Sequence, residues 1–238
     1  MIFGSVLAGG TGSRMHNENL PKQFLDIGGK PIVIYTVEKF LAAEDIDYVF
    51  IGVHKDWVSY LNDLLDKYLR GSLDRIRVVG GGETRNETIL NVIRGIEEEF
   101  GESEDHIIVS HDAVRPFLTL RIIKENIEAA IKYGAADTVF PASDTIVEAP
   151  DGKFIGTIPE RKKMYQGQTP QSFRVSLLKR LYNSLSDEEK DMLTDACKIC
   201  VVRDQPVYLV MGSDTNIKIT TPGDLKIAKA MVEGDLLV

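Results

Sequence analysis

The sequence predicts an α/β fold with a mostly parallel sheet that is covered by helices on both faces. Short apolar runs, typical of buried parallel strands, alternate with longer runs of helical periodicity. Glycine-rich segments follow several of the apolar runs, at the points where strands turn into helices. Because the chain has 238 residues and no internal repeat, we expect one domain over residues 1–238.

The alternation begins with a strand and ends with a helix. The expected strands cover residues 3–8, 48–53, 76–79, 106–110, 137–141 and 207–211. The expected helices cover residues 32–42, 57–69, 85–100, 120–133, 176–184 and 222–233. Ligands of such sheets bind beyond the carboxyl ends of the strands. The segments that follow these strands are therefore the candidate site.

One segment breaks the alternation. Residues 145–148 and 153–158 flank Ala149-Pro150-Asp151-Gly152, which has the composition of a turn. This pattern predicts a β-hairpin that projects from the domain as an arm at about residues 144–162. Because a lone hairpin is marginal in water, we expect it to pair with the same hairpin of a second subunit. A hairpin folded onto its own domain is the alternative.

Composition excludes several classes of partner. The net charge of −8 argues against binding to nucleic acid or to an anionic membrane surface. The first residues do not resemble a signal peptide, and no apolar run approaches the roughly 20 residues of a membrane span. Cys197 and Cys200 are expected to be ordinary thiols near a helix-to-strand junction, since a zinc site needs two more ligands. We expect a cytoplasmic protein.

The first glycine-rich segment directly follows the first expected strand. It reads Leu7-Ala8-Gly9-Gly10-Thr11-Gly12-Ser13-Arg14-Met15, and Pro21-Lys22-Gln23 lies just beyond it. Glycines let the backbone approach a polyphosphate, whose oxygens successive N–H groups can bind. Because Arg14 and Lys22 add two cations, the segment favours a triphosphate over a single phosphate. A tight turn with solvated basic residues is the alternative.

The second segment is Gly80-Gly81-Gly82-Glu83-Thr84-Arg85-Asn86-Glu87-Thr88, between a strand and a helix. Its three glycines leave no side-chain wall, so a flat base could lie against the backbone, whose polar groups could bind the edge of the base. A flexible connection is the alternative.

Two later segments add charged groups to the candidate site. In Val109-Ser110-His111-Asp112-Ala113-Val114-Arg115-Pro116, Asp112 suits a Mg²⁺ ion that also binds phosphate oxygens. Arg115 could bind a second phosphate, and His111 is interpreted as structural. In Asn216–Leu225, Thr221 before Pro222 predicts a helix start, and Lys218 could reach phosphates from the approach to that helix.

These segments resemble one family along nearly the whole chain. Their order is LAGGTGSRM, PKQF, GGETRNET, HDAVRP, PASDT, QTPQSF, TDA and NIKITTPGDL. The chain is similar to the cytidylyltransferase family that contains 2-C-methyl-D-erythritol 4-phosphate cytidylyltransferase and ribitol-5-phosphate cytidylyltransferase. The resemblance implies a Rossmann-like nucleotidyltransferase domain, CTP and a polyol phosphate as substrates, Mg²⁺ as cofactor, and a homodimer formed through the arm.

The resemblance also implies a role for each matching residue. The catalytic residues would be Arg14, Lys22 and Lys218. The nucleotide would be bound by Leu7, Ala8, Gly9, Gly10, Gly12, Gly81, Gly82, Glu83, Arg85, Thr88 and Asp112, and Asp112 would also hold Mg²⁺. The acceptor would be bound by Arg115, Thr145, Arg161 and Thr169, of which the last two would come from the partner subunit.

The choice between the two branches of the family depends on few residues. Val114 departs from the alanine that is usual in the methylerythritol branch. Residues 54–58, 165–171 and 194–198 resemble the ribitol branch, which favours D-ribitol 5-phosphate as the acceptor. Methylerythritol phosphate is the alternative substrate, and an inactive nucleotide-binding homologue is the alternative of another class. CDP-ribitol would feed cell-surface polymer synthesis, with a reductase as a possible pathway partner.

The reaction that the resemblance implies needs no general base. An acceptor phosphate oxygen would attack the α-phosphorus of CTP in line, and a phosphate monoester with a second pKa of about 6 is largely dianionic at pH 7. The barrier is then mainly charge repulsion and alignment, which the cations Arg14, Lys22 and Lys218 would reduce together with Mg²⁺.

Overall fold

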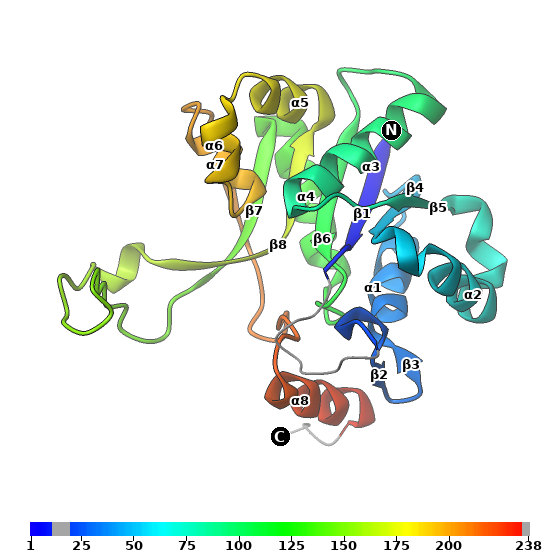
Figure 1. The fold of residues 1–238 in the computed structure, drawn as a ribbon, viewed down its shortest axis with the longest axis horizontal. Coiled ribbons are helices and arrows are strands. Elements are labelled where there is room, and N and C mark those ends of the chain that lie inside the picture. The colour runs from blue at the N-terminus through cyan, green and yellow to red at the C-terminus, as the bar shows by residue number, and fades with distance from the viewer. Residues whose placement is uncertain (11–19, 235–238) are drawn as a thin grey trace.

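A seven-stranded sheet forms the centre of the molecule in the computed structural model, which describes residues 1–10 and 20–234 (Figure 1). The strand order is β5-β4-β1-β6-β8-β7-β9. The strands are β1 (Ile2–Ala8), β4 (Tyr48–Val53), β5 (Ile76–Gly80), β6 (Ile107–Asp112), β7 (Ala135–Pro141), β8 (Tyr165–Arg174) and β9 (Tyr208–Met211). Only β8 of these seven pairs antiparallel with its neighbours, so the mostly parallel sheet is confirmed.

Helices cover both faces of this sheet, as predicted. They are α1 (Ile32–Leu41), α2 (Val58–Leu69), α3 (Arg85–Phe100), α4 (Leu120–Tyr133), α5 (Val175–Asn183), α6 (Asp187–Asp191), α7 (Ala196–Val201) and α8 (Pro222–Glu233). One apolar cluster joins α1, α2 and α4 to the sheet, and it includes Phe40 and Leu61. A second cluster joins α3, α5 and α7 to the opposite face, around Phe3 and Phe173.

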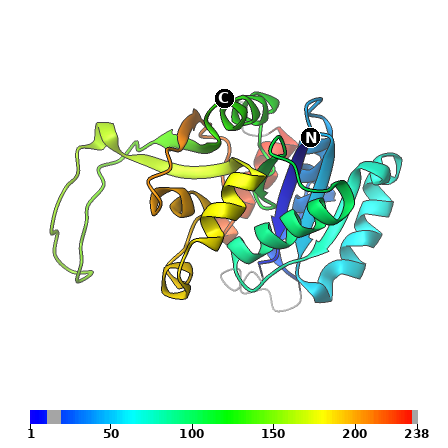
Figure 2. The same ribbon diagram turned by 90° about the horizontal axis from the view of Figure 1, so that it is seen from above.

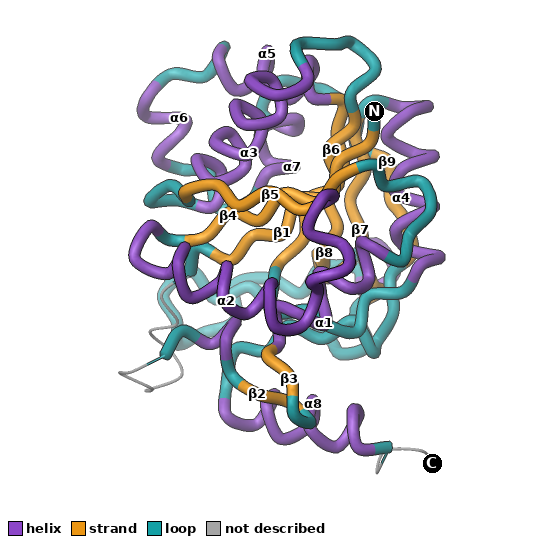
Figure 3. Tube along the Cα trace, turned by 90° about the vertical axis from the view of Figure 1, so that its right-hand side faces the viewer, coloured by secondary structure: helices purple, strands orange, loops and turns teal. Residues whose placement is uncertain are grey.

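A small lobe lies beyond the carboxyl ends of the parallel strands (Figure 3). It consists of α8 and the ribbon β2 (Asp26–Ile27) and β3 (Lys30–Pro31), which follow the 3₁₀ turn η2 (Lys22–Phe24). Ile27, Ile32, Val114 and Ile219 form its buried core. The lobe therefore brings together segments from the beginning and the end of the chain, next to the strand ends.

The helices α3, α4 and α8, which flank the candidate site, each begin with a side-chain cap. Thr84 and Thr221 each form a capping box, with Glu87 and Asp224 respectively, and Thr119 caps α4. The predicted start of α8, with Thr221 before Pro222, is confirmed. These caps position the glycine-rich turn before α3 and the Lys218 segment before α8.

The strand β8, the short helices α6 and α7, and the ribbon β2–β3 were not predicted. The sequence of β8 is polar although Thr169, Gln171 and Ser172 are buried, and at least one polar atom of each side chain is hydrogen-bonded to another element. The helices α6 and α7 are too short to show a helical period. Cys197 and Cys200 lie buried and unbridged on α7, and burial raises the pKa of Cys200 to about 12. This agrees with ordinary thiols.

Residues 142–164 connect β7 to β8 and project from the domain, as Figures 1 and 2 show. We call these residues the arm. The prediction that residues 145–148 and 153–158 form two strands is wrong, because a single antiparallel bridge, between Glu148 and Thr157, joins them. Asp151 accepts hydrogen bonds from the backbone N–H groups of Lys153 and Phe154 at the tip. The apolar side chains of the arm, Phe154 and Ile155 among them, are exposed.

The helices of the described residues are all too short or too polar to cross a membrane.

Candidate active site

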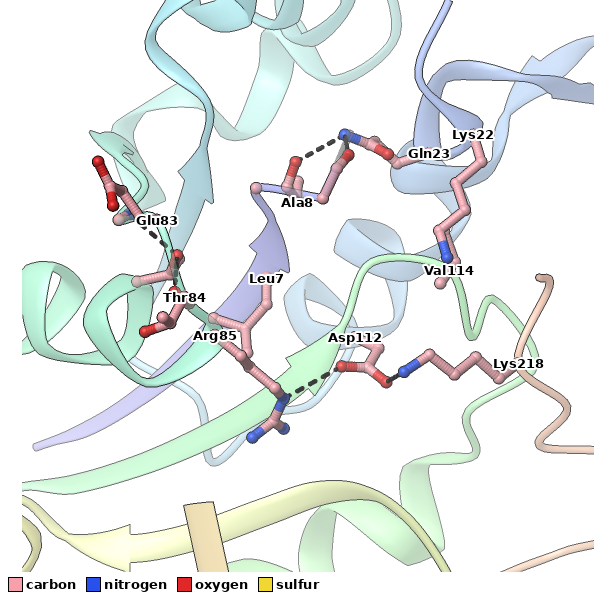
Figure 4. Close-up of a pocket in the computed structure, with 14 residues that line it drawn as sticks. Leu7, Ala8, Lys22, Gln23, Glu83, Thr84, Arg85, Asp112, Val114 and Lys218 are labelled. Carbon is pink, nitrogen blue, oxygen red and sulfur yellow. Dashed lines mark hydrogen bonds and ion pairs between the residues drawn. The ribbon is translucent and has the colours of Figure 1, made fainter. Parts of the chain in front are cut away.

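A pocket opens beyond the carboxyl ends of β1, β5 and β6, where the sequence places the candidate site (Figure 4). The predicted residues that line it are Leu7, Ala8, Gly9, Gly10, Lys22, Gly82, Glu83, Arg85, Thr88, Asp112 and Lys218. Gln23, Thr84 and Val114 also line it and were not predicted. Gly12 and Arg14 lie outside the described residues. The fold thus brings four distant segments of the chain to one cavity.

The carboxylate of Asp112 lies at the centre of a group of cations. Its Oδ2 atom is 2.8 Å from Nζ of Lys218 and 3.7 Å from Nε of Arg115, and its Oδ1 atom is 3.5 Å from Nε of Arg85. The terminal nitrogens Nη1 and Nη2 of Arg85 have no hydrogen-bond partner among the described residues. Positive charge therefore exceeds negative charge in this group.

These cations determine the charge state of Asp112. Burial alone would raise its pKa, but Arg85, Lys218 and Arg115 together hold the pKa well below its usual range. Asp112 is therefore ionised at neutral pH. An anionic ligand that entered the pocket would compete with this carboxylate for the same cations.

His111 connects Asp112 to the neighbouring strand. Its Nε2 lies 3.0 Å from the carbonyl oxygen of Arg115, which can only accept, so Nε2 carries the proton. The Nδ1 atom then accepts a hydrogen bond from the hydroxyl of Thr169 at 2.9 Å. The same hydroxyl accepts from the backbone N–H of Asp112 at 3.2 Å. Burial lowers the pKa of His111 to about 4, which keeps the ring neutral as this arrangement requires, and the structural interpretation of His111 is consistent with it.

This arrangement corrects one expectation from the sequence. Thr169 was expected to act in the site of a partner subunit, but it is buried and hydrogen-bonded next to Asp112 of its own chain. Arg115 is also engaged within the chain, where its Nη1 donates to the carbonyl oxygen of Asn216 at 2.7 Å. By contrast, Thr145 and Arg161 lie on the arm, and Arg161 donates to the carbonyl oxygen of Ser143.

The second glycine segment is held by the hydroxyl of Thr88. This hydroxyl accepts from the N–H of Gly82 at 3.0 Å and donates to the carbonyl oxygen of Thr84 at 3.0 Å. A Cβ atom at Gly82 would collide with the side chain and backbone of Glu87, so only glycine fits there. Thr88 was expected to surround the nucleotide. It lines the pocket, but its hydroxyl shapes the loop. Gly81 does not line the pocket, and it packs against the backbone of Val53.

The Lys218 segment is fixed on both sides of the lysine. Asn216 donates to the carbonyl oxygen of Thr169 at 2.8 Å, and the N–H of Ile219 donates to the carbonyl oxygen of Val114 at 2.9 Å. Ile219 is fully buried in the small lobe. Lys218 is therefore held at the pocket by contacts on either side of it, which the sequence alone did not indicate.

The side chains at the pocket offer enough ligand atoms for Mg²⁺ only if a phosphate ligand supplies further oxygens. Among the described residues, no group of three or more His, Cys, Asp or Glu side chains could hold a metal. Mg²⁺ commonly binds one or two carboxylates and completes its shell with water and phosphate oxygens. Asp112 can supply such a carboxylate. Its ion pairs with Lys218 and Arg85 would have to lengthen or break to admit the metal.

A half-buried pair of carboxyl groups, Asp137 and Asp195, was missed by sequence reasoning. The side-chain amide of Gln171 donates to Asp137 at 3.1 Å and to Asp195 at 2.8 Å. Burial and the charge of Asp195 raise the pKa of Asp137 to about 7. Two of the residues belong to motifs that the sequence analysis singled out, because the hydrogen bond from Gln171 to Asp195 joins QTPQSF to TDA. Their contact could not be foreseen without β8.

The chain is similar to known proteins along nearly its whole length. A model of the family IspD, 2-C-methyl-D-erythritol 4-phosphate cytidylyltransferase, matches residues 2–234. The 4-diphosphocytidyl-2C-methyl-D-erythritol synthase of Anaerococcus prevotii is 27% identical, with a TM-score of 0.79 over 98% of this chain and 96% of that one. The 2-C-methyl-D-erythritol 4-phosphate cytidylyltransferase of Francisella tularensis is 26% identical, with a TM-score of 0.78 over 95% and 97%. That of Thermus thermophilus is 26% identical, with a TM-score of 0.75 over 98% and 100%.

Proposed function

The chain belongs to the IspD family of cytidylyltransferases, and from this premise we propose that it transfers CMP from CTP to D-ribitol 5-phosphate and releases pyrophosphate. The observation that carries the transfer reaction is the Asp112 cluster. Three cations within 3.7 Å of one carboxylate, at a pocket lined by two glycine segments, suit a polyphosphate and a second phosphate. An inactive homologue would not need to retain Lys22, Asp112 and Lys218 together in the pocket.

In the proposed mechanism the protein aligns two anions and reduces their repulsion. Lys22 and Lys218 line the pocket, where they can neutralise the charge that develops on the phosphates. Mg²⁺ held by Asp112 would supply further charge neutralisation when bound. His111 is neutral, buried and engaged on both ring nitrogens, so it takes no proton from the acceptor. A dianionic acceptor phosphate needs no general base.

The choice of D-ribitol 5-phosphate is supported by sequence segments that contact the site. Gln168, in the segment 165–171, donates to the carbonyl oxygen of Ser213 at 2.7 Å and accepts from Asn216, close to Lys218. Trp57, in the segment 54–58, packs against Phe24, close to Lys22. The names of the similar structures favour methylerythritol phosphate, which is therefore the second candidate.

A pyrophosphate-release assay with CTP and each acceptor tests the proposal. With D-ribitol 5-phosphate as acceptor, we expect a kcat/KM at least about tenfold higher than with 2-C-methyl-D-erythritol 4-phosphate. The reverse preference would assign the chain to the methylerythritol branch. No release with either acceptor, from folded protein supplied with Mg²⁺, would support an inactive homologue.

We also propose that the active enzyme is a homodimer in which the arm of one subunit reaches the acceptor site of the other. The support is the position of Arg161 and Thr145 on the arm. Neither is among the described residues that line the pocket of their own chain. The product would be CDP-ribitol, and a reductase that supplies ribitol phosphate is the class of pathway partner that we expect.

A further inference from the structure

The side chain of Gln23 has no assigned role, although it lies against the first glycine segment. Gln23 is 2% exposed and belongs to the turn η2, directly after Lys22. Its Nε2 atom donates to the carbonyl oxygen of Ala8 at 2.7 Å and to that of Gly10 at 3.0 Å (Figure 4). Both partners are carbonyl oxygens, which only accept, and the amide nitrogen of Gln23 supplies the two N–H donors that they need.

Two consequences follow from this contact. A trans peptide group is planar, so fixing the carbonyl oxygen of Ala8 also fixes the N–H of Gly9 on the opposite side of the same peptide. Gly9 and Gly10 have no side chains with which to hold their own conformation. The orientation of this backbone, which lines the pocket, therefore depends on a side chain from another segment.

The turn that carries Gln23 is itself firmly anchored. Phe24 is 2% exposed and packs against the rings of Trp57 and Tyr60 at centroid distances of 5.4 and 5.1 Å. The N–H of Phe24 donates to the carbonyl oxygen of Pro21 at 3.0 Å. On this turn, Lys22 lines the pocket, Gln23 holds the glycine segment and Phe24 anchors both to the core.

We propose that Gln23 is a positioning residue that sets the backbone of Gly9 and Gly10, at a fixed distance from Lys22, in the conformation that binds the triphosphate of CTP. The proposal rests on the proposed function only in taking CTP as the nucleotide that binds. It does not depend on which acceptor the enzyme uses.

The test compares Gln23→Met with Asn126→Leu, a matched control. Asn126 is a fully buried amide that also donates two hydrogen bonds, to Ile122 and Thr138, but it does not line the pocket. Calorimetric CTP binding, without acceptor, and thermal melting are measured for both variants. We expect both to melt at lower temperature than the wild type, and only Gln23→Met to raise the Kd for CTP, by about fivefold or more. The KM for the acceptor at saturating CTP should change less than about twofold.

A second variant keeps the test decisive if Gln23→Met does not fold. Gln23→Asn keeps the amide but is one methylene too short to reach both carbonyl oxygens, so its Kd for CTP should also rise. A Kd within about twofold of the wild-type value, in whichever of the two variants is folded, would overturn the proposal. So would an equal rise in Asn126→Leu. Failure of the wild type to use D-ribitol 5-phosphate would refute the proposed acceptor and leave this measurement of CTP binding unaffected.

Discussion

The pocket and the arm differ in where their side chains find partners. In the pocket, the side chain of Asp112 is 10% exposed and has three cations around it, all from its own chain. On the arm, Phe154 is 76% exposed and Ile155 is 61% exposed, and a single bridge joins the two sides. The pocket is therefore shaped by the contacts of one chain. The arm presents apolar surface that its own chain does not cover, which is expected of a segment that binds another molecule.

The largest effect should come from the centre of the pocket. We expect Asp112→Ala to reduce kcat/KM by about 100-fold or more, because it removes the proposed metal ligand and leaves three cations without a counter-charge. Excess chelator should abolish the activity of the wild type. Asp105→Ala is the control, since Asp105 is exposed and pairs only loosely, at 3.7 Å, with Arg174. Full activity of folded Asp112→Ala, or of the wild type in chelator, would exclude this role.

An intermediate effect should show whether the arm completes the pocket of a second subunit. Arg161→Ala and Lys22→Ala are each expected to reduce activity by at least about tenfold as homodimers. In a mixed dimer of the two, sharing across subunits would place both defects in one site and leave the other site intact. About half of the wild-type activity should then return, because one of two sites is whole. The activity of purified, doubly tagged heterodimers measures this.

Lys162→Ala provides the matched control for the arm. Lys162 follows Arg161 in the same exposed turn, η5 (Arg161–Lys163), but has no predicted role. Its homodimer should keep its activity. Low activity in a verified heterodimer of Arg161→Ala and Lys22→Ala would show that each site takes both residues from one chain. That result would refute sharing, as would a monomer at assay concentration.

The same contrast explains how far sequence reasoning could go. Asp112 and Lys218 were predicted because they lie in recognisable segments after apolar runs, and the parallel sheet brings strand ends together. Gln23 was missed because its contact is with backbone carbonyl oxygens, which no residue type reveals. Thr169 was assigned to a partner by the family resemblance, whereas β8, which was not recognised, places it beside Asp112 of its own chain. The strands of the arm were overpredicted because β-propensity does not supply a surface to pack against.

The smallest effect should be on the pH dependence of the free energy of unfolding, to which titratable groups in the domain contribute and those on the exposed arm do not. The raised pKa of Asp137, about 7, means that the native state holds a proton that the unfolded chain releases near pH 4. Asp137 therefore lowers the free energy of unfolding as pH rises from about 4 to 7. The lowered pKa of His111, about 4, has the opposite sign, because the unfolded chain binds a proton that the native state does not. Between about pH 5 and 6.5 the contributions of Asp137 and His111 oppose each other in the wild type, and the lowered pKa of His106, caused mainly by burial, adds to that of His111.

Removing the carboxyl group of Asp137 should leave the opposing contribution of the histidines to the pH dependence of the free energy of unfolding. In Asp137→Asn we expect the free energy of unfolding to rise more steeply with pH between about 5 and 6.5 than in the wild type. The two slopes should differ by at most about 1.4 kcal/mol per pH unit, which is the limit for the one proton of Asp137. Asp151→Asn on the arm is the control. The backbone N–H groups of Phe154 and Lys153 lower the pKa of Asp151, so it is ionised in both states above about pH 5 and its loss should leave the slope unchanged. Denaturant titrations at several pH values measure all three slopes, and an equal slope in Asp137→Asn and wild type would show that Asp137 does not bind its proton in the native state.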